Sequence, residues 1–116
     1  MRRIRPFTAT KVVGVTFNNA QENIKRLARK DIPLELVREP NNPYDPNAIK
    51  VMVAEWFLGY IRKELASKLA PEIDAGKQYE ASFVCINRSP YHDLVGLTIR
   101  ITEIGDWEDA YNRILR

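Results

Sequence analysis

A rigid turn that carries an aromatic ring and a carboxylate stands out in this sequence. Prolines at positions 40, 43 and 46 each fix φ and remove a backbone donor, so the segment is predicted to form neither a helix nor a central strand. Tyr44 and Asp45 lie between two of these prolines, with an alternating apolar run on either side. Because such a loop holds its side chains in place before a ligand arrives, little conformational entropy is lost on binding.

The polar residues of the turn allow other interpretations. Asn and Asp side chains favour hydrogen bonds to nearby backbone, so Asn42 and Asp45 could serve only to brace a hairpin connection with Tyr44 folded onto the core. Three carboxylates around the turn, those of Glu35, Glu39 and Asp45, could instead hold a magnesium ion. Carboxylates beside a turn more often cap backbone amides. The sequence leaves these alternatives open.

The usual signals of an enzyme are missing. His92 is the only histidine and Cys85 the only cysteine, so no set of zinc ligands can be assembled. Cys85 is expected to be a buried, inert thiol within a strand. No serine stands in a Gly-x-Ser-x-Gly turn, and the five glycines are isolated rather than grouped to cradle a phosphate. The chain is predicted to be a binding protein without a cofactor or metal.

Length and composition indicate one globular domain. The chain has 116 residues, of which 45% are hydrophobic and 28% charged, enough for a single modest core. There is no run of about twenty apolar residues, so no membrane partner is expected, and the basic N-terminus lacks the apolar run of a signal peptide. The single cysteine excludes an internal disulfide and agrees with a reducing, cytoplasmic location.

The charge distribution permits a nucleic-acid partner without requiring one. The formal net charge is +3, a value that many soluble domains reach. Three arginines lie within the first five residues, and Arg62 and Lys63 follow a strand expected to end at Tyr60. Either cluster could equally be an ordinary solvated face.

Hydrophobic periodicity predicts six strands and two or three short helices. The strands are expected at residues 11–17, 34–38, 48–53, 56–60, 78–86 and 94–102, and the helices at 20–30, 63–75 and 107–116. Asn18 and Asn19 offer an N-cap to the first helix, Pro71 is expected to kink or divide the second, and Gly76 suits its C-terminal end. Residues 87–93 are expected to form a polar loop.

Six short strands in a basic chain of this size favour a small closed barrel, because closure removes exposed sheet edges. The predicted fold class is therefore mainly β, an OB-like or SH3-like barrel with two or three short helices. Strict alternation selects the side chains that point inward, since a slip of one residue would place polar groups in the core. These are Val13, Val15, Leu36, Val51, Leu97 and Ile99.

Four segments of the sequence resemble the HIRAN domain family. They are Val-Val-Gly-Val-Thr-Phe at 12–17, Leu-Glu-Leu-Val-Arg-Glu-Pro-Asn-Asn-Pro-Tyr-Asp-Pro-Asn-Ala-Ile at 34–49, Leu-Gly-Tyr-Ile-Arg-Lys-Glu-Leu-Ala at 58–66 and Leu-Ala-Pro-Glu-Ile-Asp-Ala-Gly at 69–76. The second segment is the most specific. The similarity, over residues 11–103, implies a six-strand OB-like barrel domain at 11–104, between a basic segment at 1–10 and a helical extension at 105–116.

The resemblance also implies a function. Eukaryotic members of the family lie at the N-terminus of SWI2/SNF2-type remodellers that act at stalled replication forks, where they bind single-stranded DNA and capture its free 3′-hydroxyl end. This chain resembles the stand-alone, prokaryotic or phage-type members. Its expected partners are single-stranded DNA or DNA 3′ ends, together with a helicase or nuclease supplied by another chain.

Site residues follow from the family motif, position by position. Asp45 matches the acidic residue that accepts a hydrogen bond from the terminal 3′-hydroxyl. Tyr44 and Phe17 match the aromatic residues that stack on terminal bases. Lys63, with Arg62 beside it, matches a basic residue that meets a backbone phosphate. Asn42 lies in the motif and is expected to brace the turn.

Two positions depart from the end-binding members of the family. Thr16 stands where those members have a basic residue, and Tyr60 stands where they have a histidine. Two polar contacts to the terminal nucleotides are therefore expected to be missing, although the ring of Tyr60 could stack on a base instead. DNA binding in general follows from the resemblance more firmly than capture of an end.

Two other classes of function remain alternatives. Exposed rings of Tyr44, Tyr60 and Trp56 would let an SH3-like barrel dock a proline-rich or extended peptide. Carboxylates of the turn could alternatively bind magnesium and cleave nucleic acid. Salt dependence separates the first alternative from nucleic-acid binding, which weakens steeply as salt increases.

Overall fold

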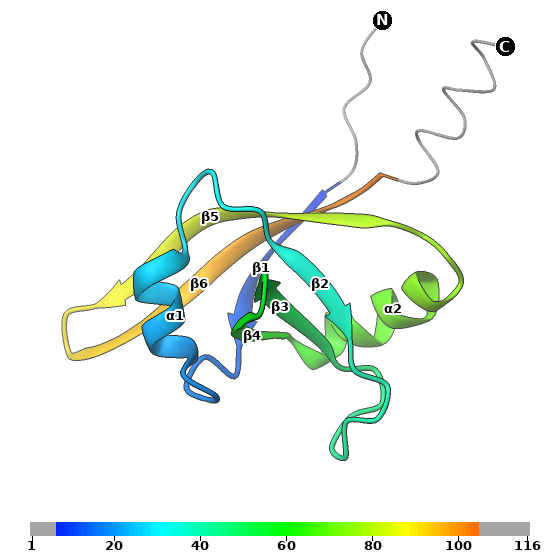
Figure 1. Cartoon of the computed structure of the whole chain (residues 1–116), viewed down its shortest axis with the longest axis horizontal. Helices are drawn as coiled ribbons and strands as arrows, with labels where there is room; N and C mark the ends of the chain where they lie inside the picture. The colour runs from blue at the N-terminus through cyan, green and yellow to red at the C-terminus, as the bar shows by residue number, and fades with distance from the viewer. Residues whose placement is uncertain (1–6, 105–116) are drawn as a thin grey trace, which may run out of the picture.

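The computed structural model describes residues 7–104, which form six antiparallel strands and two helices (Figure 1). The strands are β1 (Phe7–Val13), β2 (Glu35–Arg38), β3 (Ile49–Val53), β4 (Trp56–Ile61), β5 (Tyr79–Ser89) and β6 (His92–Glu103). The helices are α1 (Ala20–Leu27) and α2 (Lys63–Asp74). The mainly β fold class predicted from the sequence is confirmed.

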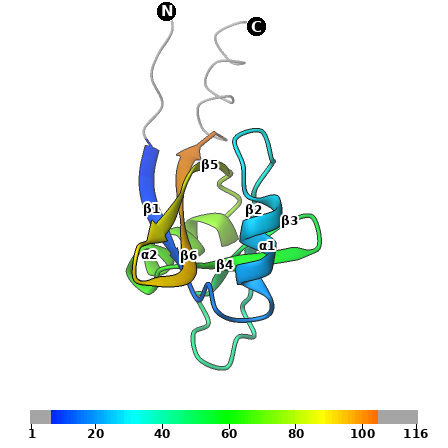
Figure 2. The same cartoon turned by 90° about the vertical axis from the view of Figure 1, so that its left-hand side faces the viewer.

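All six strands belong to one curled sheet in the order β2-β3-β4-β1-β6-β5. Strand β1 joins two halves of the sheet, because its residues 7–11 pair with β6 and its residues 12–13 pair with β4. In Figure 2, β1 and β6 run upright while β3 and β4 lie across them. A single bridge between Leu34, just before β2, and Ala81 of β5 links the two outer strands, so the sheet curls back on itself like an OB-type barrel.

The core fills the inside of this curled sheet. Alternate residues of β3 are buried, and so are Val95, Leu97, Ile99 and Ile101 of β6. The strict alternation of these two strands therefore predicts their inward faces correctly. From the helices, Ala20 and Ile24 of α1 and the Leu65, Ala66, Leu69 and Ala70 stripe of α2 close the core.

Strand β1 has a different register from the one predicted. The inward residues are Thr10 and Val12, whereas Val13 is 42% exposed and Val15, beyond the strand, is only partly buried. Adjacent valines make either register look apolar in the sequence, and Gly14, with φ of 67°, turns the chain away directly after them. The strand also begins earlier than expected, because residues 7–10, assigned above to the N-terminal segment, pair with β6.

Strands β5 and β6 form a longer hairpin than predicted. Residues 87–93 were expected to be a polar loop, but the ladder continues to a pair between Ser89 and His92. Backbone pairing does not require apolar side chains, and Asn87 donates a 2.9 Å cross-strand hydrogen bond from Nδ2 to Oγ1 of Thr98. Cys85 lies in a strand as expected but is exposed rather than buried, beside a register shift between Phe83 and Cys85.

The two helices follow the predicted positions with two differences. Asn19 occupies the N-cap of α1, but its side chain makes no capping hydrogen bond. Helix α2 continues through Pro71 as one helix instead of dividing, and Gly76 ends it with φ of 101° and a backbone bond to Ile73. Neither described helix is long and apolar enough to cross a membrane. The helix expected at 107–116 and the N-terminal arginines lie outside the described residues.

Candidate nucleic-acid interface

An open groove of about 1180 Å³ lies between the β2–β3 loop, the segment after β1 and the end of β4. We call it the first groove. Six predicted binding residues line it, namely Phe17, Asn42, Tyr44, Asp45, Tyr60 and Lys63. Arg62, the seventh predicted residue, does not line this groove. Its guanidinium contacts Oγ1 of Thr10 at 3.3 Å and Oε1 of Glu64 at 3.5 Å.

The side chain of Asn42 holds the β2–β3 loop in shape. Its Oδ1 accepts hydrogen bonds from the backbone amides of Tyr44 at 2.8 Å and Asp45 at 3.1 Å. On the other side, its Nδ2 donates to Oε1 of Glu39 at 2.6 Å. These bonds satisfy two backbone amides of a loop in which the prolines prevent regular strand pairing. Asn42 therefore braces the turn, as the sequence suggested.

Arg38 anchors the same loop to helix α2. Its guanidinium donates to the carbonyl oxygens of Ala48 at 2.8 Å and Pro46 at 3.0 Å. It also donates to both carboxylate oxygens of Asp74, at 2.9 and 3.1 Å, and this hydrogen bonding lowers the pKa of Asp74. A planar guanidinium suits this arrangement, because it presents several donors in fixed directions. No signal in the sequence pointed to Arg38, since its partner lies 36 residues away.

Glu39 forms a small polar network at the wall of the first groove. It accepts the hydrogen bond from Asn42 and a second one, of 2.8 Å, from the hydroxyl of Tyr60. Lys50 lies 3.6 Å from its other oxygen. The hydrogen bond from Asn42 is the main cause that lowers the pKa of Glu39. Burial first, and then the bond to Glu39, raise the pKa of Tyr60 above its ordinary value of 10.0.

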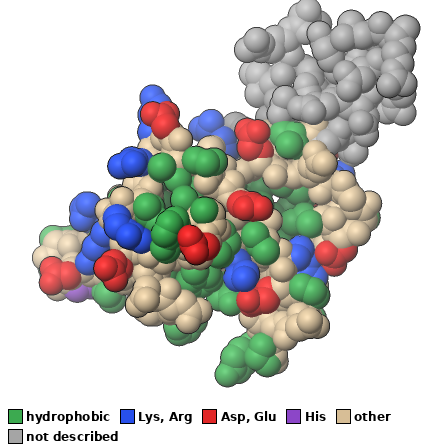
Figure 3. Space-filling model, in the orientation of Figure 1, with side chains coloured by type: hydrophobic (Ala, Val, Ile, Leu, Met, Phe, Trp, Pro, Cys, Tyr) green, Lys and Arg blue, Asp and Glu red, His purple; other side chains and the backbone are tan. Residues whose placement is uncertain are grey.

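Two aromatic rings line the first groove and are not part of the hydrophobic core. Tyr44 is 93% exposed and Phe17 is 58% exposed. In Figure 3, hydrophobic side chains stand out at the tip of the β2–β3 loop, near the bottom of the view. The rings of Tyr60 and Phe17 both lie close to Gly14, because a Cβ atom added to this glycine would be 3.2 Å from the Tyr60 ring and 3.3 Å from the Phe17 ring. The interpretation in which Tyr44 folds onto the core is therefore wrong.

Asp45 uses one carboxylate oxygen within the turn. Its Oδ1 accepts a 2.9 Å hydrogen bond from the backbone amide of Asn47. Within residues 7–104, no group donates a hydrogen bond to Oδ2. The side chain is half-buried and lines the first groove, so this second oxygen can accept a hydrogen bond from a ligand.

The first groove is not strongly basic. Lys63 is exposed, lines the groove and forms no ion pair with any described residue. The carboxylates of Glu39 and Asp45 also line the groove, and Glu39 already has Lys50 as a partner. The described lining of the first groove therefore offers aromatic rings and hydrogen-bonding groups together with one lysine.

The arrangement does not support the alternatives drawn from the sequence. Tyr60 is half-buried beside Tyr44 in the first groove, whereas Trp56 lines a different hollow, so the three rings do not form one surface. Across residues 7–104, no three His, Cys, Asp or Glu side chains are grouped to hold a metal ion. The sequence placed Val13 in the core, whereas this side chain and Asn18 help to line the groove.

Sequence comparison identifies the family. A model described as the HIRAN domain matches residues 7–102. A Fanconi-associated nuclease 1 homolog from Oryza sativa subsp. japonica is 33% identical over 109 residues, which are 89% of this chain and 11% of that protein. A helicase-like transcription factor from Oryctolagus cuniculus is 60% identical over 40 residues, 34% of this chain and 4% of that protein. The chain thus spans a small part of the length of both curated relatives.

Two solved structures share the fold. The HIRAN domain of human HLTF superimposes with a TM-score of 0.64 at 28% identity, covering 84% of this chain and 74% of that chain. A protein from Lactobacillus plantarum has a TM-score of 0.61 at 24% identity, covering 85% and 100%. The second likeness shows the fold alone.

The curled six-strand sheet, with a bridge between its two outer strands, defines a domain of the OB-like class. The chain belongs to the HIRAN domain family. The family predicted from the sequence motifs is thereby confirmed, and the match begins at Phe7, where β1 begins.

Proposed function

We propose that this HIRAN domain binds single-stranded DNA in the first groove and holds its free 3′-hydroxyl end there. The terminal bases stack on Tyr44 and Phe17, and the 3′-hydroxyl donates a hydrogen bond to Asp45. Lys63 meets a backbone phosphate near the end of the strand. Such a module would act in DNA repair or replication-fork processing in the cytoplasm, with helicase or nuclease activity supplied by another chain.

The position of Asp45 is the observation that carries the proposal. One of its oxygens is fixed by the turn, and the other, which accepts no hydrogen bond from a described residue, lies beside two exposed rings. A charged acceptor makes a stronger hydrogen bond to a hydroxyl than a neutral one does. A terminal phosphate would instead meet a like charge, so this site would select hydroxyl ends.

The test uses the purified chain and fluorescence anisotropy with strands of one sequence that differ only in their ends. We expect tight binding of the 3′-hydroxyl strand, weaker binding of the 3′-phosphorylated strand and of a circular strand, and a measurable loss of affinity as salt increases. Equal binding of all three strands would end the proposal of end capture and leave general DNA binding. Binding that ignores salt would favour peptide docking instead.

A further inference from the structure

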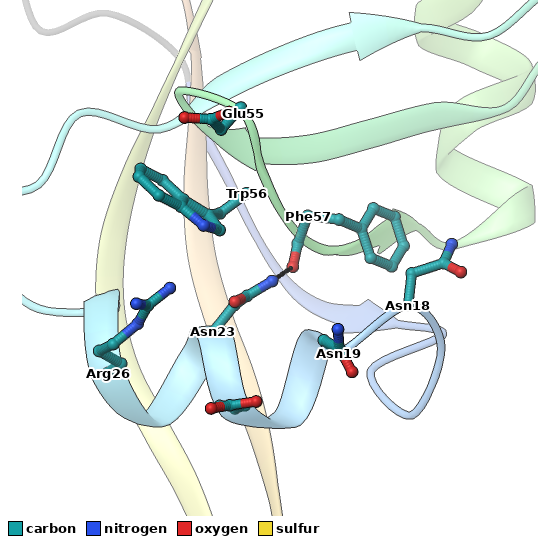
Figure 4. Close-up of a pocket in the computed structure, with 8 residues that line it drawn as sticks. Asn18, Asn19, Asn23, Arg26, Glu55, Trp56 and Phe57 are labelled. Carbon is teal, nitrogen blue, oxygen red and sulfur yellow. Dashed lines mark hydrogen bonds between the residues drawn. The ribbon is translucent and has the colours of Figure 1, made fainter.

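A second groove of about 400 Å³ lies between helix α1 and the turn that joins β3 to β4 (Figure 4). We call it the second groove. Its lining includes Asn18, Arg26 and Trp56. Asn18 lines the first groove as well, so one residue forms the border between the two. The two grooves therefore adjoin one another at Asn18.

Trp56 lines the second groove and is not part of the core. It begins β4 and is 38% exposed, although an indole offers one of the largest apolar surfaces of any side chain. The guanidinium of Arg26 lies 5.4 Å from the centre of its ring, which orients the ring. In Figure 4, the indole and Arg26 face one another across the mouth of the groove.

The floor of the second groove is held in place by a buried hydrogen bond. Asn23 is buried on α1 and donates from Nδ2 to the carbonyl oxygen of Phe57 at 2.9 Å, as drawn in Figure 4. This bond fixes α1 against β4, so the spacing between Arg26 and Trp56 is preset. A preset groove loses little entropy when a base enters.

Exposed cations at the C-terminal end of α1 favour a polyanion that passes over this helix. Four exposed cations follow one another at the end of this helix and just beyond it: Lys25, Arg26, Arg29 and Lys30. None of them forms an ion pair with a described residue, and Figure 3 shows Lys and Arg side chains gathered over α1. Glu22 and Glu55 line the groove itself, so phosphates are expected to run along the cations while bases face the indole.

We propose that the second groove is a subsite for the same single strand, in which a base stacks on Trp56 and the phosphates follow Lys25 to Lys30. This inference rests on the proposed function, because it extends the strand held in the first groove. It gives the domain a binding site of several nucleotides, in keeping with the site sizes of about 4–16 nucleotides found for OB folds. A base that enters the groove would take the place of Arg26 on the indole, and Arg26 would then meet a phosphate.

The test compares two thymidine strands with free 3′-hydroxyl ends, one of about 4 and one of about 12 nucleotides, by anisotropy. The longer strand should bind the wild-type chain more tightly and with a steeper salt dependence. Trp56→Ala should weaken binding of the longer strand about five- to a hundredfold, as the loss of one stacked base does. Binding of the short strand should not change, which also shows that the variant is folded.

Two further variants separate stacking from charge. Trp56→Phe keeps a stacking ring and should restore most of the lost affinity. The double variant Lys25→Ala with Arg29→Ala should reduce the salt slope by about 0.7 for each phosphate that is no longer neutralised, and should do so for the longer strand alone. Lys68→Ala, an exposed lysine of α2 outside both grooves, serves as the control and should change nothing.

The outcomes distinguish the two proposals. If both strands bind equally, or if Trp56→Ala leaves the longer strand unaffected, the second groove is not a subsite while the first-groove proposal stands. If Trp56→Ala weakens both strands alike, the residue acts through the fold and the inference is wrong. If neither strand binds the wild-type chain, the proposed function fails and the inference fails with it.

Discussion

The hydroxyl of Tyr60 donates a 2.8 Å hydrogen bond to Oε1 of Glu39 in the wall of the first groove. This bond engages the only proton of the hydroxyl, so towards a ligand Tyr60 can act only as an acceptor or through its ring. The ring itself packs edge-on against Phe57, with centroids 5.1 Å apart. At a position where end-binding relatives are expected to have a histidine, this chain therefore carries a structural link between β4 and the β2–β3 loop.

The first prediction concerns the pH dependence of this link. The pKa of Glu39 is lowered below its ordinary value of 4.5, chiefly by the bond from Asn42, so the folded state favours the carboxylate. Its stabilising effect is present above pH 4.5 and is lost as the pH falls through the folded-state pKa. Glu39→Gln should therefore lower the free energy of unfolding by about 1 kcal/mol at neutral pH, and this difference should shrink as the pH falls below 4.5.

Urea denaturation of both proteins between about pH 3 and pH 7 measures this difference. Glu35→Gln is a matched control, because Glu35 is exposed on β2 and lies outside the network. A difference between wild type and Glu39→Gln that stays constant over this pH range would show that ionisation of Glu39 does not stabilise the fold.

The second prediction concerns Tyr44. Its exposed ring has no role in the core, so Tyr44→Ala should leave the melting temperature unchanged. Loss of one stacked base should weaken binding of a short single strand by about 1–3 kcal/mol, whatever its sequence. Tyr91, which is 91% exposed at the turn of the β5–β6 hairpin, provides the matched control. An equal loss for Tyr91→Ala would mean that Tyr44 has no special role.

The third prediction concerns Lys63. As a cation without an ion-pair partner among residues 7–104, it is available for one phosphate. Lys63→Ala should reduce the slope of log affinity against log salt by about 0.7, and should do so equally for all sequences. Lys68→Ala on the same helix is the control. An unchanged slope, measured by anisotropy at several salt concentrations, would assign the phosphate to another residue.

The fourth prediction separates the two possible roles of Asp45. Asparagine keeps an Oδ1 that can accept the bond from Asn47, but it removes the charge. If Asp45 only caps the turn, Asp45→Asn should be nearly neutral in both stability and binding. If Asp45 receives the 3′-hydroxyl, binding of hydroxyl ends should weaken by about 1.5–3 kcal/mol.

The same variant should also narrow the difference in affinity between hydroxyl and phosphate ends, because the repulsion of the phosphate is removed. Anisotropy with both kinds of strand measures binding, and thermal melting confirms that the turn is intact. A variant that loses affinity for both ends equally would assign Asp45 to general binding rather than to end recognition.

Local pattern in the sequence determined the elements and the stiff turn. Three of these patterns each span only a few residues: the alternation in β3 and β6, the proline spacing around Tyr44, and the glycine after α2. The structure agrees with all three. The family motif includes the stiff turn and the end of α2. For that reason the fold class and six of the residues that line the first groove could be predicted from the sequence.

Contacts between distant segments were decided only by the tertiary structure. The register of β1 depends on its pairing with β4 and β6, because two adjacent valines satisfy either alternation. The clamp of Arg38 on Asp74 and the bond of Tyr60 to Glu39 join residues 36 and 21 positions apart. The second groove likewise exists because α1 packs against β4, which brings Arg26 over Trp56. Periodicity describes the faces of single elements, whereas these contacts arise when the faces meet.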